Sequence, residues 1–133
     1  MRVFLIAMFV WAASLTAGVT QSQDIQNVIE SQLEAFKADD FTQAFTYASP
    51  SIQRVFRDPE NFGRMVRGGY PMVWRPAEVR FLELREISDQ FFQRVLITSM
   101  TGKTHILDYH MIENAGSWKI NGVYMVKLPI TNT

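Results

Sequence analysis

The chain has 133 residues, 47% of them hydrophobic, and its formal net charge is zero. The length suits one domain with one core, and the share of apolar residues excludes an intrinsically disordered chain. Zero net charge argues against a nucleic-acid partner, and the absence of cysteine excludes disulfides and thiolate metal sites.

The N-terminal segment has the layout of a secretory signal peptide. One positive charge, Arg2, precedes an uncharged apolar run from Val3 to about Ala17, and the small residue Gly18 follows. We expect cleavage within residues 17–23, although the segment contains no clear A-x-A site. The alternative is a retained N-terminal membrane anchor, because the run is close to the shortest that spans a bilayer.

This layout divides the chain into three parts. Residues 1–20 are the expected signal peptide, residues 24–128 a single domain, and residues 129–133 a C-terminal tail. We therefore expect a periplasmic or secreted protein with no stable membrane span after cleavage.

The first half of the domain has the patterns of helices. Asp24 is the expected N-cap of the first helix, because its carboxylate can accept hydrogen bonds from the free amides of the first turn. An apolar stripe at helical spacing follows it, made of Ile25, Val28, Ile29, Leu33 and Phe36. Asp39-Asp40 should interrupt the helical stretch.

Two further helix starts are expected at Ser49 and Asp58, since each precedes a proline, which suits the first helical position. Gly68-Gly69 should end the helical half. The faces expected to be buried are Ile52, Val55 and Phe56 in one helix, and Phe62, Met65 and Val66 in the other.

The second half has the composition of strands, rich in β-branched and aromatic residues. The segments are 77–87, 90–100, 103–113 and 117–127, separated by short turn signals. Such short connections require antiparallel neighbours. Helices followed by a four-stranded meander predict an α+β domain in which the helices pack on one face of a strongly curved antiparallel sheet.

Two positions decide how this sheet bends. Strict alternation cannot place all the apolar residues of 77–87 on one face, so either both faces are covered or a bulge lies between Phe81 and Leu82. Asn121-Gly122 is a strong hairpin signal. A hairpin would leave two very short strands, so we favour one strand that bends or bulges at Gly122.

Four segments resemble a bacterial family catalogued as domain of unknown function 4864: "AFKADDFTQAFTYASPSIQRVF", "PENFGRMVRGGYPMVWRPAEVRFLEL", "HILDYHMI" and "SWKINGVYMV". The resemblance covers about Ile25 to Val126. It implies a nuclear transport factor 2-like, or cystatin-like, fold, with helices wrapped by a curved sheet around a conical pocket. It implies no activity, ligand or catalytic residue. Since fold alone does not determine function, the site must be argued from its residues.

Asp108 and His110 are the candidate catalytic pair, because side chains two apart on a strand share a face. They could act as a general base and its partner. The alternative is a partly wet outer face, with Tyr109 pointing into the core. A metal site is disfavoured, because His105 and His110 are an odd number of residues apart and no cysteine is present.

The candidate binding residues at the pocket rim are Tyr70, Trp74, Arg75, Tyr109 and Trp118. Prolines stiffen the segment that carries the first three, and Arg75 would suit a carboxylate or phosphate. The alternative is a rigid linker whose Trp74 fills the core, and for Trp118 simple core packing. Four arginines could also line one side of the middle helices: Arg54, Arg57, Arg64 and Arg67.

These observations favour an exported, non-catalytic binding or accessory module of the cell envelope. It would hold a small apolar or amphipathic ligand, or form a homodimer through its sheet. The alternative is a small pocket enzyme, of isomerase or dehydratase type, with Asp108 as base. We expect neither a cofactor nor a metal.

Overall fold

The computed structural model describes residues 17–127, with side chains from residue 21 onward. Within this range the helices are α1 (Ala17–Lys37), α2 (Phe41–Thr46), α3 (Pro50–Phe56), α4 (Pro59–Gly69) and α5 (Pro71–Trp74). The strands that follow are β1 (Pro76–Ile87), β2 (Gln90–Ser99), β3 (Thr104–Asn114) and β4 (Ser117–Val126). The predicted α+β class is confirmed. The predicted signal peptide, except for residues 17–20, and the predicted tail 129–133 lie outside the described residues.

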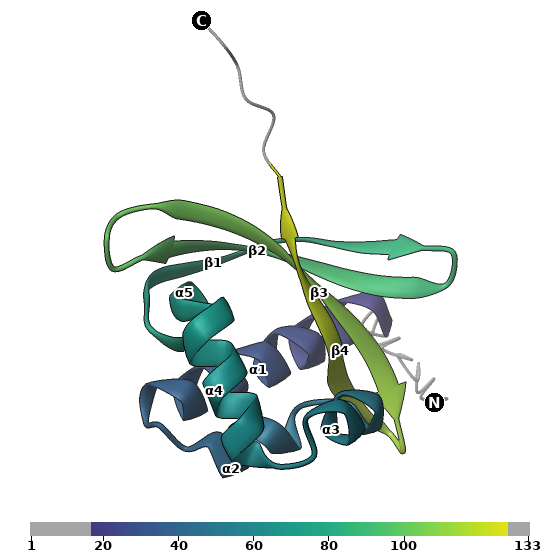
Figure 1. The fold of residues 1–133 in the computed structure, drawn as a ribbon. Coiled ribbons are helices and arrows are strands. Elements are labelled where there is room, and N and C mark those ends of the chain that lie inside the picture. The colour runs from purple at the N-terminus through teal and green to yellow at the C-terminus, as the bar shows by residue number, and fades with distance from the viewer. Residues whose placement is uncertain (1–16, 128–133) are drawn as a thin grey trace, which may run out of the picture.

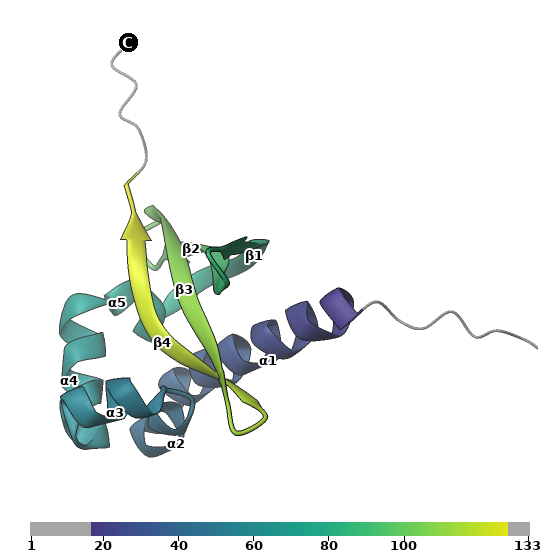
Figure 2. The ribbon, with the colours of Figure 1, turned by 90° about the vertical axis from the view of Figure 1, so that its right-hand side faces the viewer.

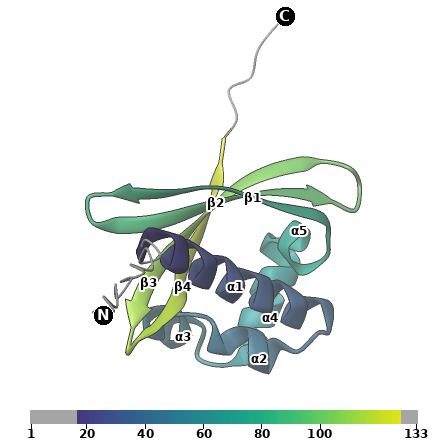
Figure 3. The same ribbon diagram turned by 180° about the vertical axis from the view of Figure 1, so that it is seen from behind.

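The strands form one sheet in the order β1-β2-β3-β4, and every neighbouring pair is antiparallel. In Figure 1, β1 and β2 lie across the top of the helices, whereas β3 and β4 bend down beside them. Figure 3 shows α1 crossing the molecule between the sheet above it and α2 and α3 below it. The helices therefore lie on one side of a bent sheet.

The pairing has a register shift at the start of β1, between Pro76 and Glu78, and two further bulges inside the sheet. In β1, Phe81 pairs with Val95 but Leu84 pairs with Gln93, so β1 carries one extra residue over this stretch. An extra residue bends the strand and increases its twist. Of the two alternatives that the sequence left open for this segment, the structure shows the bulge, between Phe81 and Leu84.

The second bulge lies in β4, which is one continuous strand rather than a hairpin. His110 pairs with Gly122 and Met111 pairs with Ile120, so Asn121 is the extra residue. The predicted bent strand is confirmed.

Local capping explains where the middle helices begin. The Ser49 hydroxyl accepts a hydrogen bond from the amide of Ile52 at 3.3 Å, and the Asp58 carboxylate accepts one from the amide of Asn61 at 2.8 Å. Each capping residue satisfies an amide that has no partner inside its helix. Both predicted starts are confirmed.

Three helical predictions are wrong. Asp24 lies inside α1, because the residues before it already continue the helix and their carbonyls bond the amides that a cap would satisfy. The helical half ends at Trp74 rather than at Gly68-Gly69, because Pro71 starts α5 directly after α4. Val55 is 70% exposed, because α3 turns only its Ile52 side toward the protein.

The core lies between α1 and the middle of the sheet. The inner sheet face contributes Val95, Ile97 and Leu107, and α1 contributes Ile25 and Ile29, all of which are fully buried. Burying each such side chain contributes about 1.5–3 kcal/mol. This packing holds α1 firmly against the sheet and fixes the position of β4.

Candidate functional site

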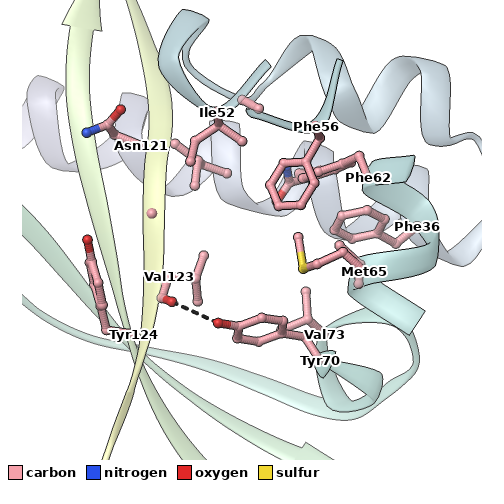
Figure 4. A pocket seen from close by; sticks show the side chains of 15 residues that line it. Phe36, Ile52, Phe56, Phe62, Met65, Tyr70, Val73, Asn121, Val123 and Tyr124 are labelled. Carbon is pink, nitrogen blue, oxygen red and sulfur yellow. Dashed lines mark hydrogen bonds between the residues drawn. The ribbon is translucent and has the colours of Figure 1, made fainter. Parts of the chain in front are cut away.

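A cavity of about 390 Å³ lies between β4, the edge strand of the sheet, and the helices. Figure 4 shows Val123 of β4 on one side of it and Phe36, Phe62 and Met65 on the other. Tyr70 closes one end, where its hydroxyl donates a hydrogen bond to the carbonyl oxygen of Val123 at 3.2 Å. Figure 2 shows from the side how β4 and α4, the two elements that flank the cavity, are placed in the fold.

The helical spacing of apolar residues builds the far wall. Phe62, Met65 and Val66 lie three or four residues apart on α4, so they project from one face of that helix. The Phe62 ring packs against the rings of Phe36 at 5.9 Å and Phe56 at 5.7 Å between centroids. These contacts hold the wall in place without any ligand.

The cavity is almost entirely apolar. Among the described residues that line it, none carries a charge. Gln32 donates to the carbonyl oxygen of Ala44 at 3.2 Å, and Tyr70 donates to Val123. Asn121 and Tyr124 border the cavity, but their side chains point away from it (Figure 4). The lining can exclude water and hold an apolar group, and its described residues include no carboxylate, histidine, lysine or arginine.

The family model described as domain of unknown function (DUF4864) matches residues 19–133. The chain belongs to the DUF4864 family. No curated protein and no solved structure matches it. The wider nuclear transport factor 2-like relationship therefore stays a prediction.

Of the residues predicted at the rim, Tyr70 lines the cavity of the DUF4864 domain but Trp74 and Arg75 do not. The Arg75 guanidinium lies 4.3 Å from the centre of the Trp74 ring, and both side chains donate to Asp39. The hydrogen bond from Trp74, followed by the hydrogen bond and the charge of Arg75, lowers the pKa of Asp39. Arg75 also donates to the carbonyl oxygen of Phe36 at 2.7 Å, so its donors serve the fold.

Tyr109 and Trp118 are likewise outside the cavity lining. Tyr109 is fully buried on the inner sheet face, and burial raises the pKa of its hydroxyl above the usual range. Its hydroxyl makes no hydrogen bond within the described part of the chain. Trp118 packs edge-on against Phe91 at 5.4 Å between ring centres.

Asp108 lies on the opposite, outer face of the sheet. Its carboxylate accepts two hydrogen bonds from Arg94, each of 3.0 Å, and one from Arg85 of 2.8 Å. The hydrogen bonds from Arg94, together with the charges of both arginines, lower the pKa of Asp108. A carboxylate held ionised in this way is a weak base, and it does not line the cavity. The geometry therefore gives no support to catalysis by Asp108.

His110 also lies on the outer face, where its ring stacks on Phe92 with centroids 4.9 Å apart. Its Nδ1 is 3.4 Å from the side-chain nitrogen of Asn121. His105 pairs with Ile97, whose side chain is buried on the inner face, so the two histidines do not converge. The described residues contain no cluster of three or more histidine, aspartate or glutamate side chains that could hold a metal ion.

The residues of the wall were recognised from the sequence only as core. The stripes that predicted a buried face for Ile52 and Phe56 and for Phe62 and Met65 identified the correct sides of α3 and α4. What they could not show is that these sides meet an open space.

In the described part of the chain, no helix has the length and apolar character that crossing a membrane requires.

Proposed function

We propose that this protein is a non-catalytic binding module of the bacterial cell envelope, which holds a small apolar or amphipathic molecule in the cavity beside β4. The observation that carries the proposal is the cavity itself. Its volume, about 390 Å³, falls within the range of small-molecule sites, and none of the described residues that line it is charged. A ligand that fills it must be uncharged over the part that enters.

The absence of chemical groups in the lining supports binding rather than catalysis. Proton transfer needs a titratable group within hydrogen-bond reach of the ligand. The polar side chains facing the cavity are the amide of Gln32 and the phenol of Tyr70, and each donates one hydrogen bond to a backbone carbonyl. The carboxylate of Asp108 is paired with Arg85 and Arg94 on the other side of the sheet.

The envelope location rests on the N-terminal sequence, with its single arginine followed by an uncharged apolar run. N-terminal sequencing of the protein recovered from the periplasm or medium tests it. A mature N-terminus between residues 17 and 23 is expected. Recovery of the full-length chain in the membrane fraction would instead favour the anchor.

An uncharged apolar dye, N-phenyl-1-naphthylamine, tests the cavity. Ile52 faces the cavity, whereas Val55 on the same helix is 70% exposed, so the two positions form a matched pair. The dye should bind the unsubstituted protein and the Val55→Trp variant with equal affinity. Ile52→Trp places an indole in the cavity and should weaken binding at least about tenfold. Equal binding by both variants would refute the proposal.

A second candidate is assembly through the outer sheet face, where Tyr124 is 56% exposed beside the Asp108 ion pairs. Opposite charges and an exposed aromatic residue on one face suit a self-complementary homodimer. Sedimentation velocity over a range of concentrations tests this candidate. A dimer that is lost in Tyr124→Glu would support it, and a monomer at every concentration would refute it.

A further inference from the structure

The cavity lies directly beside an unpaired stretch of backbone. Near one end of β4, the outward backbone groups of Ile120 are both hydrogen-bonded. Its amide donates to the carbonyl oxygen of Tyr47 at 2.9 Å, and its carbonyl oxygen accepts from the amide of Ser49 at 2.8 Å. This forms a parallel bridge between Ala48 and Ile120. The chain then turns away into α3. From Gly122 onward, β4 pairs only with β3 in the described part of the structure.

One hydrogen bond shows which way this free edge points. Tyr70 reaches the carbonyl of Val123 from the helical side, so the backbone groups of Val123 face away from β3. Backbone direction alternates along a strand, and Met125 therefore faces the same way. Within residues 17–127, the amide and carbonyl of Met125 and the amide of Val123 make no hydrogen bond to other backbone outside the sheet ladder.

In the described structure, the stretch Gly122–Val126 lacks most of the features that protect an edge strand, although the bulge at Asn121 lies just before it. Edges are commonly blocked by charged side chains, by proline or by a covering segment. The stretch Gly122–Val126 contains neither charge nor proline, and both Tyr124 and Met125 are about half exposed, at 56% and 49%. Gly122 and Val123 of this stretch also border the apolar cavity. Free backbone groups and an apolar cavity therefore lie side by side.

We propose that the natural occupant is an extended peptide segment of another protein, which adds as a strand to the free edge of β4 and places an apolar side chain in the cavity. In this mode of recognition, backbone hydrogen bonds supply affinity and pockets for alternate side chains supply specificity. The bridge at Ile120 already pairs this edge with an extended segment, and the incoming strand would continue the same line. The inference rests on the proposed function, because the same cavity must accept an apolar group.

The geometry restricts the chemistry of the peptide. Side chains of an added strand alternate between the two faces of the sheet, so every second one turns toward the helices. The one that enters the cavity must be uncharged and apolar, because no charged side chain is there to pair with it. The Tyr70 hydroxyl occupies the Val123 carbonyl in the free protein, and an amide of the peptide would take its place.

The test begins with a library of random heptapeptides displayed on phage and selected on the purified protein. We expect enriched peptides with apolar residues at alternating positions. The best sequence is then synthesised with a fluorescent label, and its dissociation constant is measured by anisotropy. Methylating the backbone nitrogens of alternate residues, which removes donors and leaves side chains unchanged, should weaken binding about tenfold for one of the two sets.

A matched pair of protein variants tests the edge itself. Met125→Pro removes an outward amide without removing a bond to β3, whereas Met125→Ala keeps that amide and shortens the side chain. We expect the proline variant to bind the peptide about tenfold more weakly and the alanine variant to bind as the unsubstituted protein does. Both should still bind N-phenyl-1-naphthylamine, which shows that they are folded.

The outcomes separate this inference from the proposed function. Dye binding without any enriched peptide, or peptide binding that neither N-methylation nor Met125→Pro weakens, would overturn strand addition and leave the cavity function standing. Failure of the dye to bind would overturn the cavity function as well. Peptide binding that is lost in both Met125→Pro and Ile52→Trp supports the inference.

Discussion

Replacing Asp108 by asparagine should destabilise the fold and leave the cavity intact. The change keeps the shape of the side chain but removes the charge that Arg85 and Arg94 share. Losing one partner of a fully buried ion pair costs about 3–5 kcal/mol, whereas exposed pairs contribute about 0–1 kcal/mol. The Asp108 side chain is 12% exposed, and those of the arginines are 36% and 22% exposed. We therefore expect an intermediate loss of about 2 kcal/mol in the free energy of unfolding.

The pH dependence of this loss has a definite sign. The arginines lower the pKa of Asp108 in the folded protein below its ordinary value of 3.8. An acid whose pKa is lowered by folding stabilises the folded state above its unfolded pKa. This stabilisation disappears as the pH falls through the folded pKa. The difference between the unsubstituted protein and Asp108→Asn should therefore be full near neutral pH and shrink below 3.8.

Urea unfolding followed by circular dichroism measures both effects. The control is Glu83→Gln, since Glu83 lies 3.8 Å from Arg94 and its side chain is 55% exposed. It should change stability by no more than about 1 kcal/mol. A loss for Asp108→Asn no larger than that of the control, or a loss that persists unchanged in acid, would refute the reasoning. Unchanged dye binding is also expected, because Asp108 does not line the cavity.

Four further substitutions test three local features by thermal or urea unfolding. Gly63→Ala should lower the free energy of unfolding by about 1–3 kcal/mol, because a Cβ at residue 63 would lie 2.8 Å from the Phe41 ring. Gly68→Ala on the same helix is the control: its Cβ meets nothing within 4 Å, so it should stabilise by about 0.5–1 kcal/mol. Equal effects of the two substitutions would contradict this prediction. Arg57 has φ 72° and ψ −43° in a γ-turn, a backbone conformation that strains a residue with a Cβ. Arg57→Gly should therefore stabilise the protein by about 1 kcal/mol, and a loss of stability would show that no strain is stored there. Ser49→Ala should cost about 1–2 kcal/mol through loss of the α3 cap, and no change would remove that role.

Features encoded within a few residues could be predicted from the sequence. The caps at Ser49 and Asp58 were recognisable because the capping residue, the proline after it and the apolar stripe lie within one turn. The strand boundaries were predictable for the same reason, since turn residues lie between apolar runs. The bulge after Phe81 followed from a change of phase in the alternation.

Asn121-Gly122 shows how a strong local signal can lose to tertiary structure. The pair favours a hairpin, yet β4 continues through it. The two short strands of a hairpin would have paired mainly with each other, whereas the continuous strand pairs along β3. Asp24 was predicted to begin the first helix, but it lies inside α1. A good capping residue is tolerated inside a helix whose preceding turn is already formed.

A pocket was expected from the family resemblance, but its lining and the ion pairs could not be predicted, because they depend on distances between elements. A stripe such as Ile52 and Phe56 shows which side of a helix turns inward, but not whether the opposite wall is near enough to fill the space. The bonds from Arg94 to Asp108 depend on the register between β2 and β3, in which these two residues pair directly. No pattern within either strand specifies that register.

The central claim is that the space between β4 and α4 admits an apolar molecule. Intermolecular nuclear Overhauser effects between N-phenyl-1-naphthylamine and methyl groups of the protein test it most directly. Contacts to Ile52, Met65 and Val123 are predicted, with none to the exposed Val55 or Ile87. Contacts to the outer sheet face alone, or no saturable contacts at all, would contradict the account.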